Sequence, residues 1–382
     1  MFDMVAKTLF GMEDILASEL SELNAQNIRI LNRAVSFSGD KKLMYSANYN
    51  LRLALKILVP IGESQLKNEN DLYPYVRSIQ WDKYMSVDET LAIDVALKSD
   101  LFTHSQFVAQ KIKDAIVDQF RDKYGRRPSV DLEFPALRIN AFLSDKRITL
   151  SIDSSGDPLY RRGYRFKQGL APLNEVLAAG LVKMTGWTGD APFVDFMCGS
   201  GTIPVEAAMM AAKIPPGSLG RPYGFQKWKD YDNDLFREIE KDVKIEKQET
   251  RIFASDFSAE AVRLATSHAR NAHVMESISF RTCDFNEVTP PAGPGVILIN
   301  PPYGERIIPE NINELYAMIG SKFKKSFEEY SAWIFSGNYE AMKHVGLRPF
   351  RKIHLFNGQL ECRLNGFALY SGSKKASKQV SS

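Results

Sequence analysis

The second half of the chain alternates between short apolar segments and amphipathic segments, and this pattern limits the fold more than any other feature. The apolar segments are rich in β-branched residues, as strands that are buried on both faces are. They include PFVDF, RIFASD, ISFRTCD and GVILIN, and helical periodicity is seen in IPVEAAMMAA and SAEAVRLATSHARNA. Strands that alternate with helices form a parallel sheet with helical crossovers. We therefore predict an α/β fold for residues 171–372, with a mostly parallel sheet.

The first half of the chain predicts two smaller α+β units. Residues 12–23 and 104–123 place apolar side chains at helical spacing, which gives each segment one buried face. The segments RAVSFSGD, ETLAIDVAL, ALRINAFL and RITLSID alternate as strands do, and the last two predict a hairpin around Ser144–Lys146. A chain of 382 residues is too long for one ordinary core, so several domains are expected.

Charge and composition exclude several classes of protein. The net charge is only +3, so any basic surface for a nucleic acid must be local. The three cysteines form no CxxC pair, which predicts no metal site and a reducing, cytoplasmic setting. No apolar run approaches the roughly 20 residues that cross a bilayer, and the first residues lack the apolar core of a signal peptide. Residues 156–170 are predicted to be a basic linker and residues 373–382 a disordered tail.

Four predicted strands of the second half end in an acidic or amide side chain. These end residues are Asp195, Asp256, Asp284 and Asn300. In an open α/β sheet, ligands bind in the crevice at the carboxyl ends of the strands. A helix cap or a turn explains any single one of these residues equally well. All four on one edge of the sheet favour a ligand site.

The loop MCGSGT, between the first of these strands and a helix, predicts the kind of ligand. Gly199 and Gly201 let the backbone approach a ligand closely, and the helix start offers free N–H groups. Pro204 stands where a dinucleotide fingerprint has its third glycine, which disfavours pyrophosphate. Asp195 at the strand end would repel phosphate but suits a cationic or amino-acid-like group.

The residues at the next two strand ends predict that the ligand contains a nucleoside. Asp256 suits the two hydroxyls of a ribose and Asp284 an adenine amino group. The predicted cofactor is S-adenosyl-L-methionine, with S-adenosyl-L-homocysteine as product and no metal, and the motif order resembles that of class I methyltransferases. The predicted cofactor-binding residues are Asp195, Cys198, Gly199, Gly201, Thr202, Asp256, Phe257, Asp284, Phe285 and Asn300.

The segment INPPYGER predicts chemistry on an amine. Prolines cannot donate to a sheet, so the strand stops at Asn300 and a stiff turn follows. The exocyclic amine of a base is a poor nucleophile, and it needs acceptors that hold its hydrogens while its lone pair turns toward a methyl group. The Asn300 side chain and the Pro301 carbonyl are two such acceptors. Pro302 stiffens the turn and Tyr303 offers a face for stacking; the alternative is a Pro-Pro turn with a packed tyrosine.

Several blocks resemble the signature blocks of THUMP-domain RNA methyltransferases, above all the branch that modifies guanosine N2 in large-subunit rRNA. These blocks are DSSGDPLYRRGYR, LAPLNEVLAAGL, VDFMCGSGTIPVEAA, INPPYGER and LFNGQLECRL. The resemblance implies a Rossmann-like class I methyltransferase domain over residues 171–372. It also implies a ferredoxin-like piece over residues 1–55 and a THUMP domain, which binds structured RNA, over residues 56–155.

Two features depart from the simplest version of this pattern. The two-enzyme fusion form of the family carries a second methyltransferase domain, and this chain ends before one could begin. Residues 213–250 separate the first two ligand strands, so Asp256 follows Asp195 by about 60 residues instead of the roughly 20 of a plain βαβ unit. The family resembled has such an insertion too. Here its PYGFQKWKDY stretch suits a lid or an RNA contact.

Two groups of cations are candidates for RNA contacts. Residues Lys111, Lys113, Arg126 and Arg127 belong to the predicted THUMP domain, and Arg161, Arg162, Arg165 and Lys167 belong to the linker. Either group could bind phosphates. A solvated helix face explains the first group equally well, and a plain cationic linker explains the second.

The leading prediction is methyl transfer to guanosine N2 of 23S rRNA, on free RNA or on a ribosome-assembly intermediate. Three alternatives stay open. They are a tRNA guanosine N2 methyltransferase, an adenine-N6 DNA methyltransferase, and a non-catalytic RNA-binding assembly factor. The first half of the chain resembles an RNA-binding module, which disfavours DNA, and the intact strand-end residues disfavour loss of catalysis.

Overall fold

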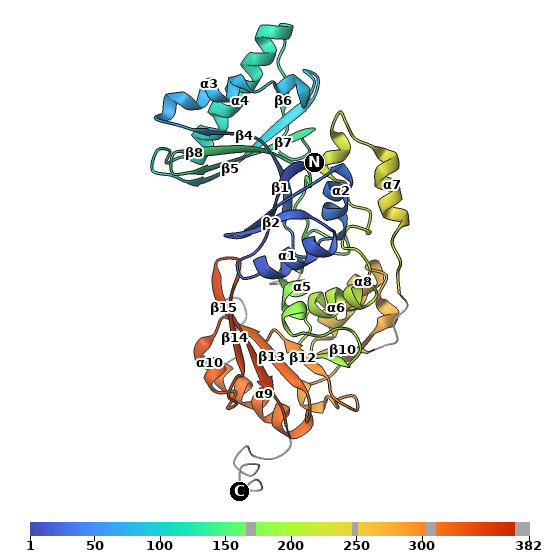
Figure 1. The fold of residues 1–382 in the computed structure, drawn as a ribbon. Coiled ribbons are helices and arrows are strands. Elements are labelled where there is room, and N and C mark those ends of the chain that lie inside the picture. The colour runs from blue at the N-terminus through green and yellow to red at the C-terminus, as the bar shows by residue number, and fades with distance from the viewer. Residues whose placement is uncertain (166–172, 247–250, 303–310, 371–382) are drawn as a thin grey trace. The chain divides into compact units, whose positions relative to one another are not determined.

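The computed structural model describes residues 1–165, 173–246, 251–302 and 311–370. It divides the chain into two compact units (Figure 1). The first unit comprises Met1–Thr8, Leu16–Leu159 and Gly220–Asp242, and the second comprises Leu9–Ile15, Tyr160–Leu219 and Val243–Ser382. The predicted disordered tail, residues 373–382, lies outside the described residues.

The first unit is built on one eight-stranded sheet with the order β2-β3-β1-β4-β8-β7-β5-β6. Its strands are β1 (Phe2–Lys7), β2 (Gln26–Leu31), β3 (Ala34–Gly39), β4 (Lys56–Gln65), β5 (Thr90–Lys98), β6 (Ser129–Val130), β7 (Leu137–Ser144) and β8 (Arg147–Asp153). The long strand β4 pairs with β1 on one side and with β8 on the other, both antiparallel. The two α+β units predicted from the sequence therefore share a single sheet.

Helices cover this sheet and supply much of its core. They are α1 (Glu13–Glu22), α2 (Lys41–Asn50), α3 (Leu72–Ser78) and α4 (Ser105–Tyr124), with 3-10 turns η1 (Glu69–Asp71) and η2 (Trp81–Lys83). Figure 1 shows α3 and α4 on the same face of the sheet, where Val108 and Ile112 of α4 are buried beside Trp81. Helix α4 ends because Gly125 adopts a left-handed backbone, with φ of 68°, and its N–H donates to the Arg121 carbonyl.

Residues 220–242 pack within the first unit although they are inserted between two elements of the second. They form η3 (Gly224–Lys227) and α7 (Asn233–Lys241), and α7 lies beside α2 (Figure 1). Phe225 is fully buried and stacks on Tyr45 with ring centroids 4.3 Å apart, while Phe236 meets both rings edge-on. Lys227 stays exposed and donates to two carbonyls of the loop before β7. Tyr223 and Phe225 of the stretch expected to be a lid or an RNA contact are therefore core residues of the first unit, whereas its Trp228 and Tyr231 are half-buried.

The second unit contains a seven-stranded sheet with the order β11-β10-β9-β12-β13-β15-β14. Its strands are β9 (Phe193–Asp195), β10 (Ile252–Asp256), β11 (Ile278–Thr282), β12 (Val296–Ile299), β13 (Ser331–Ser336), β14 (Arg351–Asn357) and β15 (Leu360–Ala368). The first five strands in this order run parallel, and β15 is antiparallel to both of its neighbours. The prediction of an α/β fold with a mostly parallel sheet is confirmed.

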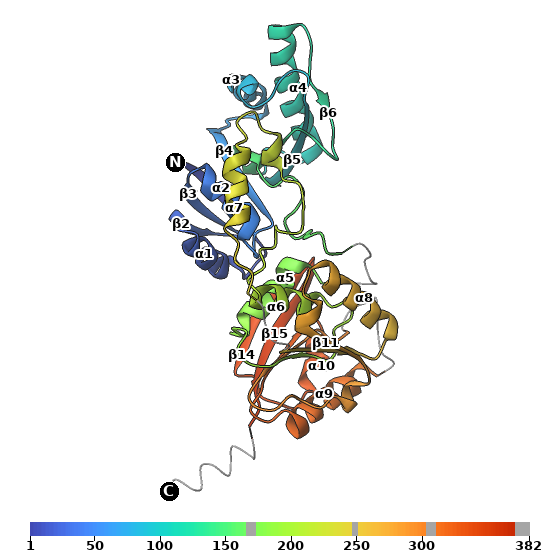
Figure 2. The same ribbon diagram turned by 90° about the vertical axis from the view of Figure 1, so that its right-hand side faces the viewer.

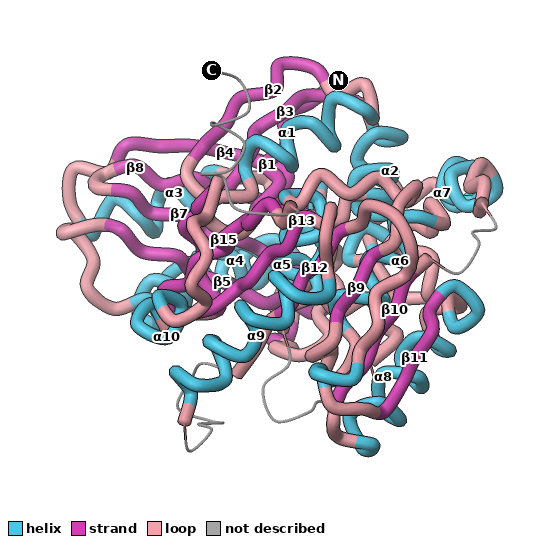
Figure 3. The backbone as a smooth tube through the Cα atoms, turned by 90° about the horizontal axis from the view of Figure 1, so that it is seen from below, coloured by secondary structure: helices cyan, strands magenta, loops and turns pink. Residues whose placement is uncertain are grey.

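Helices lie on both faces of this sheet (Figures 2 and 3). They are α5 (Glu175–Met184), α6 (Thr202–Ala211), α8 (Ala259–Asn271), α9 (Ile312–Ser326) and α10 (Tyr339–Lys343), with 3-10 turns η4 (Met275–Ser277) and η5 (Phe285–Glu287). On one face, Tyr316 and Phe323 of α9 pack on Ile297 and Ile299 of β12. Helices α5, α6 and α8 pack together on the other face. The connection from β11 to β12 contains only the short turn η5, so no full helix crosses over at that point.

Candidate functional site

The strand order of the second sheet reverses at β9 and β12, and the carboxyl ends of these two strands lie on one edge. Chain connections lead from β9 through α6 to β10 on one side, whereas β12 pairs with β9 on the other. Ligands of open α/β sheets bind at such a reversal point. Asp195 is the last residue of β9, Asp256 is the last of β10, and Asn300 directly follows β12. The sheet thus brings these three predicted residues to one edge, and Asp284 follows β11 on the same edge.

The loop between β9 and α6 has a fixed course along this edge. The Cys198 N–H donates to the Ser255 carbonyl of β10 at 3.0 Å, and the Gly201 N–H donates to the Cys198 carbonyl at 2.8 Å. Gly201 has φ of 79°, and a Cβ there would lie 2.7 Å from the Cβ of Ala265 in α8. Glycine is therefore required where α6 passes α8. Gly199 has φ of 51°, and no atom of the described residues lies within 4 Å of the place that its Cβ would take.

Helix α6 begins directly after this loop, and its N-cap residue, Gly201, has no side chain that could cap the first turn. Thr202 and Ile203 carry backbone N–H groups in this turn, whereas Pro204 has none. The N–H groups of a first helical turn have no partner inside the helix, and together with the helix dipole they attract anions. The start of α6 can therefore hold a carboxylate.

The Asp256 carboxylate connects the loop to the next crossover. Its Oδ2 accepts from the Gly199 N–H at 3.0 Å, and its Oδ1 accepts from the Ser258 N–H at 3.0 Å. Each carboxylate oxygen has a second lone pair. Asp256 can therefore serve the fold as a turn-former and still accept hydroxyl groups from a ligand.

Asp195 is a buried carboxyl group with few partners. It is 1% exposed, and its Oδ1 accepts from the Met197 N–H at 3.1 Å. Burial raises the pKa of Asp195 well above its usual range; the nearby charge of Asp256 raises it further, and the Met197 amide opposes the shift. A cation brought to this edge of the sheet would stabilise the ionised form. Burial also raises the pKa of the Cys198 thiol well above its usual range, so Cys198 is a neutral, packed side chain.

The other predicted cofactor residues line the far end of the edge. Asp284 caps η5, where its Oδ1 accepts from the Asn286 N–H at 2.7 Å. Phe285 stacks on Phe196 with ring centroids 5.7 Å apart, whereas Phe257 is 83% exposed. An exposed phenylalanine beside the carboxyl end of β10 offers a face for an aromatic ring.

The side-chain oxygen of Asn300 is buried directly after the end of β12. Among the described residues, no donor reaches its buried Oδ1. Unpaired buried acceptors are uncommon, because each costs about 1–3 kcal/mol of desolvation. Pro301 is buried next to it and Pro302 is half-buried, while Tyr303 lies outside the described residues. Among the described residues, an acceptor without a donor therefore lies at the turn that the sequence predicted to bind an amine.

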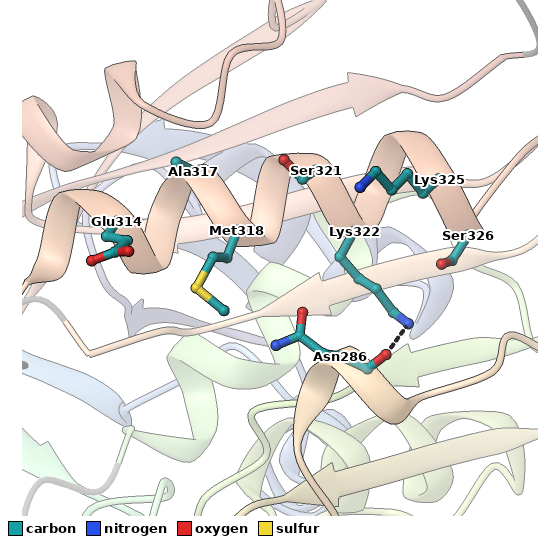
Figure 4. A pocket seen from close by; sticks show the side chains of 8 residues that line it. All are labelled: Asn286, Glu314, Ala317, Met318, Ser321, Lys322, Lys325 and Ser326. Carbon is teal, nitrogen blue, oxygen red and sulfur yellow. Dashed lines mark hydrogen bonds between the residues drawn. The ribbon is translucent and has the colours of Figure 1, made fainter.

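A shallow pocket of about 420 Å³ lies between α9 and η5 (Figure 4). It is lined by Asn286, Glu314, Ala317, Met318, Ser321, Lys322, Lys325 and Ser326. The Lys322 Nζ donates to the Asn286 carbonyl at 2.6 Å across it. None of the predicted cofactor residues lines this pocket. The pocket lies where the connection from β11 to β12 has no full helix. The edge at the strand ends fits the predicted cofactor better, because it carries the predicted residues.

The cations predicted to contact RNA differ in exposure and in their protein partners. Lys111, Lys113, Arg126 and Arg127 are exposed or half-buried on the first unit, and Arg126 pairs with Asp88 at 2.6 Å. Lys113 pairs with Asp114, and the Lys111 Nζ donates to the Glu69 carbonyl. Arg161 is exposed in the second unit, and Lys167 lies outside the described residues.

The prediction of an RNA contact is wrong for Arg162 and has no support for Arg165. Arg162 is 1% exposed, and its Nε lies 3.5 Å from Glu206, which is fully buried in α6. The Arg165 side chain is 11% exposed, and its Nε lies 3.4 Å from Glu175. Both arginines are turned inward because buried carboxylates of α5 and α6 need cationic partners. An acid inside the apolar helix IPVEAAMMAA was the sequence signal for such a partner.

The described part of the chain offers neither a metal site nor a membrane-spanning helix. No group of three or more His, Cys, Asp or Glu side chains there could hold a metal ion. Within the same residues, every helix is too short or too polar to cross a membrane.

Three protein-family models together match nearly the whole chain. Residues 162–365 match the model described as "RMKL-like, methyltransferase domain". Residues 67–153 match a THUMP domain, and residues 3–58 match the RlmL ferredoxin-like domain.

Curated relatives agree with these models. The chain is 39% identical to a protein of Synechocystis sp. provisionally named RNA methyltransferase slr0064, over 94% of this chain and 95% of the relative. It is 37% identical to the ribosomal RNA large subunit methyltransferase K/L of Syntrophotalea carbinolica, over 94% of this chain and 52% of the relative. The chain thus spans about half the length of that K/L protein.

Solved structures share the architecture. A possible methylase from Clostridium difficile 630 superposes with a TM-score of 0.88 at 29% identity, over 98% of this chain and 99% of that one. SMU.472, a provisionally named methyltransferase complexed with SAH, superposes with a TM-score of 0.85 at 26% identity, over 97% and 99%. The domain models and the relative that is matched over 95% of its length agree: the chain belongs to the family of RMKL-like methyltransferases that carry a THUMP domain and an RlmL-type ferredoxin-like domain.

Proposed function

We propose that this protein transfers a methyl group from S-adenosyl-L-methionine to an exocyclic amine of a base in RNA, with guanosine N2 of 23S rRNA as the target. The observation that carries the proposal is the buried Asn300 Oδ1, which has no donor among the described residues. It lies beside β9, at the reversal point of the sheet. A substrate amine would supply the missing donor.

The residues at this edge of the sheet fit the proposed cofactor. The open first turn of α6 suits a carboxylate, and the buried Asp195 suits the cationic part of the same amino-acid group. Asp256 can accept ribose hydroxyls, and Asp284 and Phe285 would face the adenine. The sulfonium of the cofactor supplies an already activated methyl group, so the protein needs no strong base and no metal.

Asn300 and Pro301 would then act on the base. Their two oxygens would accept the amine hydrogens, which turns the nitrogen lone pair out of conjugation and toward the methyl group. The prolines fix both acceptors before the substrate arrives, so little reorganisation accompanies the reaction. Tyr303 would stack on the base. After transfer, the methylated nitrogen carries one extra proton, which it can release through the Asn300 oxygen to water.

Three facts support RNA as the substrate over DNA. The THUMP and ferredoxin-like models cover most of the first unit, and the curated relatives are named RNA methyltransferases. Arg126, Arg127 and Arg161 are exposed and Lys111 and Lys113 are half-buried, and we propose that these cations contact phosphates. The K/L names favour rRNA over tRNA and a catalyst over an assembly factor. We place this activity in the cytoplasm, where ribosomes are assembled.

Mass spectrometry of nucleosides tests the proposal. We expect N2-methylguanosine to fall in 23S rRNA from a deletion strain and to return when the gene is restored. Loss of methylation from tRNA alone would move the substrate to tRNA, and loss of N6-methyladenine from DNA would replace RNA with DNA. An unchanged modification profile of all three nucleic acids would contradict a catalytic role.

A further inference from the structure

Residues 162–165 of the second unit pack against the helices α5, α6 and α8. Arg162, Tyr164 and Arg165 all turn inward, and the Asn271 side chain of α8 donates to the Tyr164 carbonyl at 3.0 Å. The Tyr164 hydroxyl donates to Glu206 Oε1 of α6 at 3.2 Å. These residues are therefore a built part of the methyltransferase unit.

Arg165 is the member of this segment that reaches the start of α6. One of its terminal nitrogens, Nη2, donates to the Leu173 carbonyl at 2.7 Å and also to the Thr202 hydroxyl. Thr202 is the first residue of α6 and directly follows Gly201 of the glycine loop. The Thr202 side chain is buried.

The charge of Arg165 is unusual for this position. A cation beside a helix N-terminus opposes the helix dipole, so such a placement is unfavourable unless an anion is bound there. Glu175 offsets part of the charge, at 3.4 Å from the Arg165 Nε. A carboxylate held by the first turn of α6 would offset the rest.

We propose that Arg165 is a positioning residue for the carboxylate end of the cofactor, acting through Thr202. The guanidinium fixes the first turn of α6 and adds positive potential to it, so that its N–H groups are aimed at an anionic ligand. This inference rests on the proposed function, because it needs an amino-acid-bearing nucleoside as ligand.

The test compares two ligands that differ only at the amino-acid end. S-adenosylhomocysteine carries the carboxylate, and methylthioadenosine has the same adenosine and sulfur without it. Calorimetry on the full chain should show that Arg165→Met weakens S-adenosylhomocysteine about tenfold, the scale of one lost hydrogen bond to a charged group. Binding of methylthioadenosine should change less than about twofold, because its contacts lie at the other strand ends.

Matched variants separate positioning from general damage. Thr202→Val should also weaken S-adenosylhomocysteine selectively, whereas Thr202→Ser, which keeps the hydroxyl, should bind it normally. The double variant Arg165→Met with Thr202→Val should bind S-adenosylhomocysteine no more weakly than either single variant. Arg162→Met, which removes a buried arginine of the same segment that contacts Glu206 instead, should lower the Tm but leave the ratio of the two affinities unchanged. If Arg165→Met fails to fold, the two Thr202 variants carry the test.

Two outcomes overturn the inference. Equal weakening of both ligands by Arg165→Met or Thr202→Val would mean that the contact only holds the fold together. Unchanged binding of S-adenosylhomocysteine would mean that the contact is irrelevant to the cofactor. A wild-type chain that binds neither ligand would instead refute the proposed function itself.

Discussion

Replacing Asp195 with asparagine should weaken cofactor binding and at the same time remove a source of instability. Asp195→Asn keeps the shape of the side chain and an oxygen that can accept from the Met197 N–H. It removes a carboxyl group that is 1% exposed and lies near the like charge of Asp256. A hydrogen bond to a charged group contributes about 1.5–3 kcal/mol, so we expect S-adenosylhomocysteine to bind roughly 10- to 150-fold more weakly.

The effect on stability depends on pH in a defined direction. The pKa of Asp195 is raised in the folded chain, chiefly by burial, so the folded protein holds this proton more tightly than the unfolded chain. Its contribution to stability is complete below the ordinary Asp pKa of about 3.9 and is lost as pH rises toward the folded pKa. The loss amounts to about 1.4 kcal/mol for each pH unit of that interval. Asparagine shows no such loss.

Thermal unfolding from pH 4 to pH 8, without ligand, measures this difference. The Tm of Asp195→Asn minus the Tm of the parent protein should increase with pH. Each kcal/mol of stability that the parent loses corresponds to roughly 2–4 °C for a unit of this size. Calorimetry at pH 7 then measures the loss of ligand affinity. A Tm difference that does not change with pH, together with normal affinity for S-adenosylhomocysteine, would refute the assignment of Asp195 as a buried group held for a cationic ligand.

Three further predictions follow from the same contacts. Gly201→Ala should lower both the Tm and the cofactor affinity, because its Cβ would collide with α8. Gly199→Ala should cost only about 1–2 kcal/mol of backbone strain, yet its Cβ should block the cofactor. Equal losses of Tm in the two variants would contradict this contrast. Asp256→Ala should weaken S-adenosylmethionine by about 1–3 kcal/mol in calorimetry, while a chelator should leave methyl transfer unchanged; loss of activity with the chelator would show a metal requirement. Removing residues 1–159 should make the remaining chain aggregate, because Phe225 and its neighbours would lose the residues against which they pack. Replacing residues 220–242 of the truncated chain with a short linker should then restore a monomer that binds cofactor but binds RNA poorly. A truncated chain that keeps residues 220–242 and is still monomeric would contradict the assignment of Phe225 to the core of the first unit.

The strands β9, β10, β11 and β12 of the second unit were predicted from the sequence because their signals are local, whereas β13, β14 and β15 were not predicted. Each parallel strand is a short β-branched run bounded by a polar end residue, and such runs specify a buried strand wherever they occur. The positions of Asp195, Asp256 and Asn300 at one edge then follow from the geometry of parallel sheets. The class I fold could therefore be predicted before any contact was known.

Features that depend on distant contacts could not be predicted in the same way. Arg162 looks like a solvated cation in a basic linker, and only the folded chain shows its ion pair with Glu206, 44 positions later. The mixed aromatic and cationic stretch around Phe225 gives no sign that it completes the core around Tyr45, 180 positions earlier in the chain. The continuous eight-stranded sheet depends on β4, whose proline and glycine weaken its strand signal.

Single-turnover methyl transfer by Asn300 variants tests the central claim most directly. The assay uses rRNA from a deletion strain at saturating cofactor, so that it reports chemistry and not cofactor binding. Asn300→Ala removes one fixed acceptor, and we expect the rate to fall by about 10²–10³, the cost of losing one preorganised hydrogen-bonding group in other enzymes. Affinity for S-adenosylhomocysteine should stay near normal, and Asn300→Asp should keep part of the activity because it retains an oxygen acceptor. An Asn300→Ala enzyme that methylates rRNA at the full rate would contradict the proposed role of the buried oxygen and the mechanism built on it.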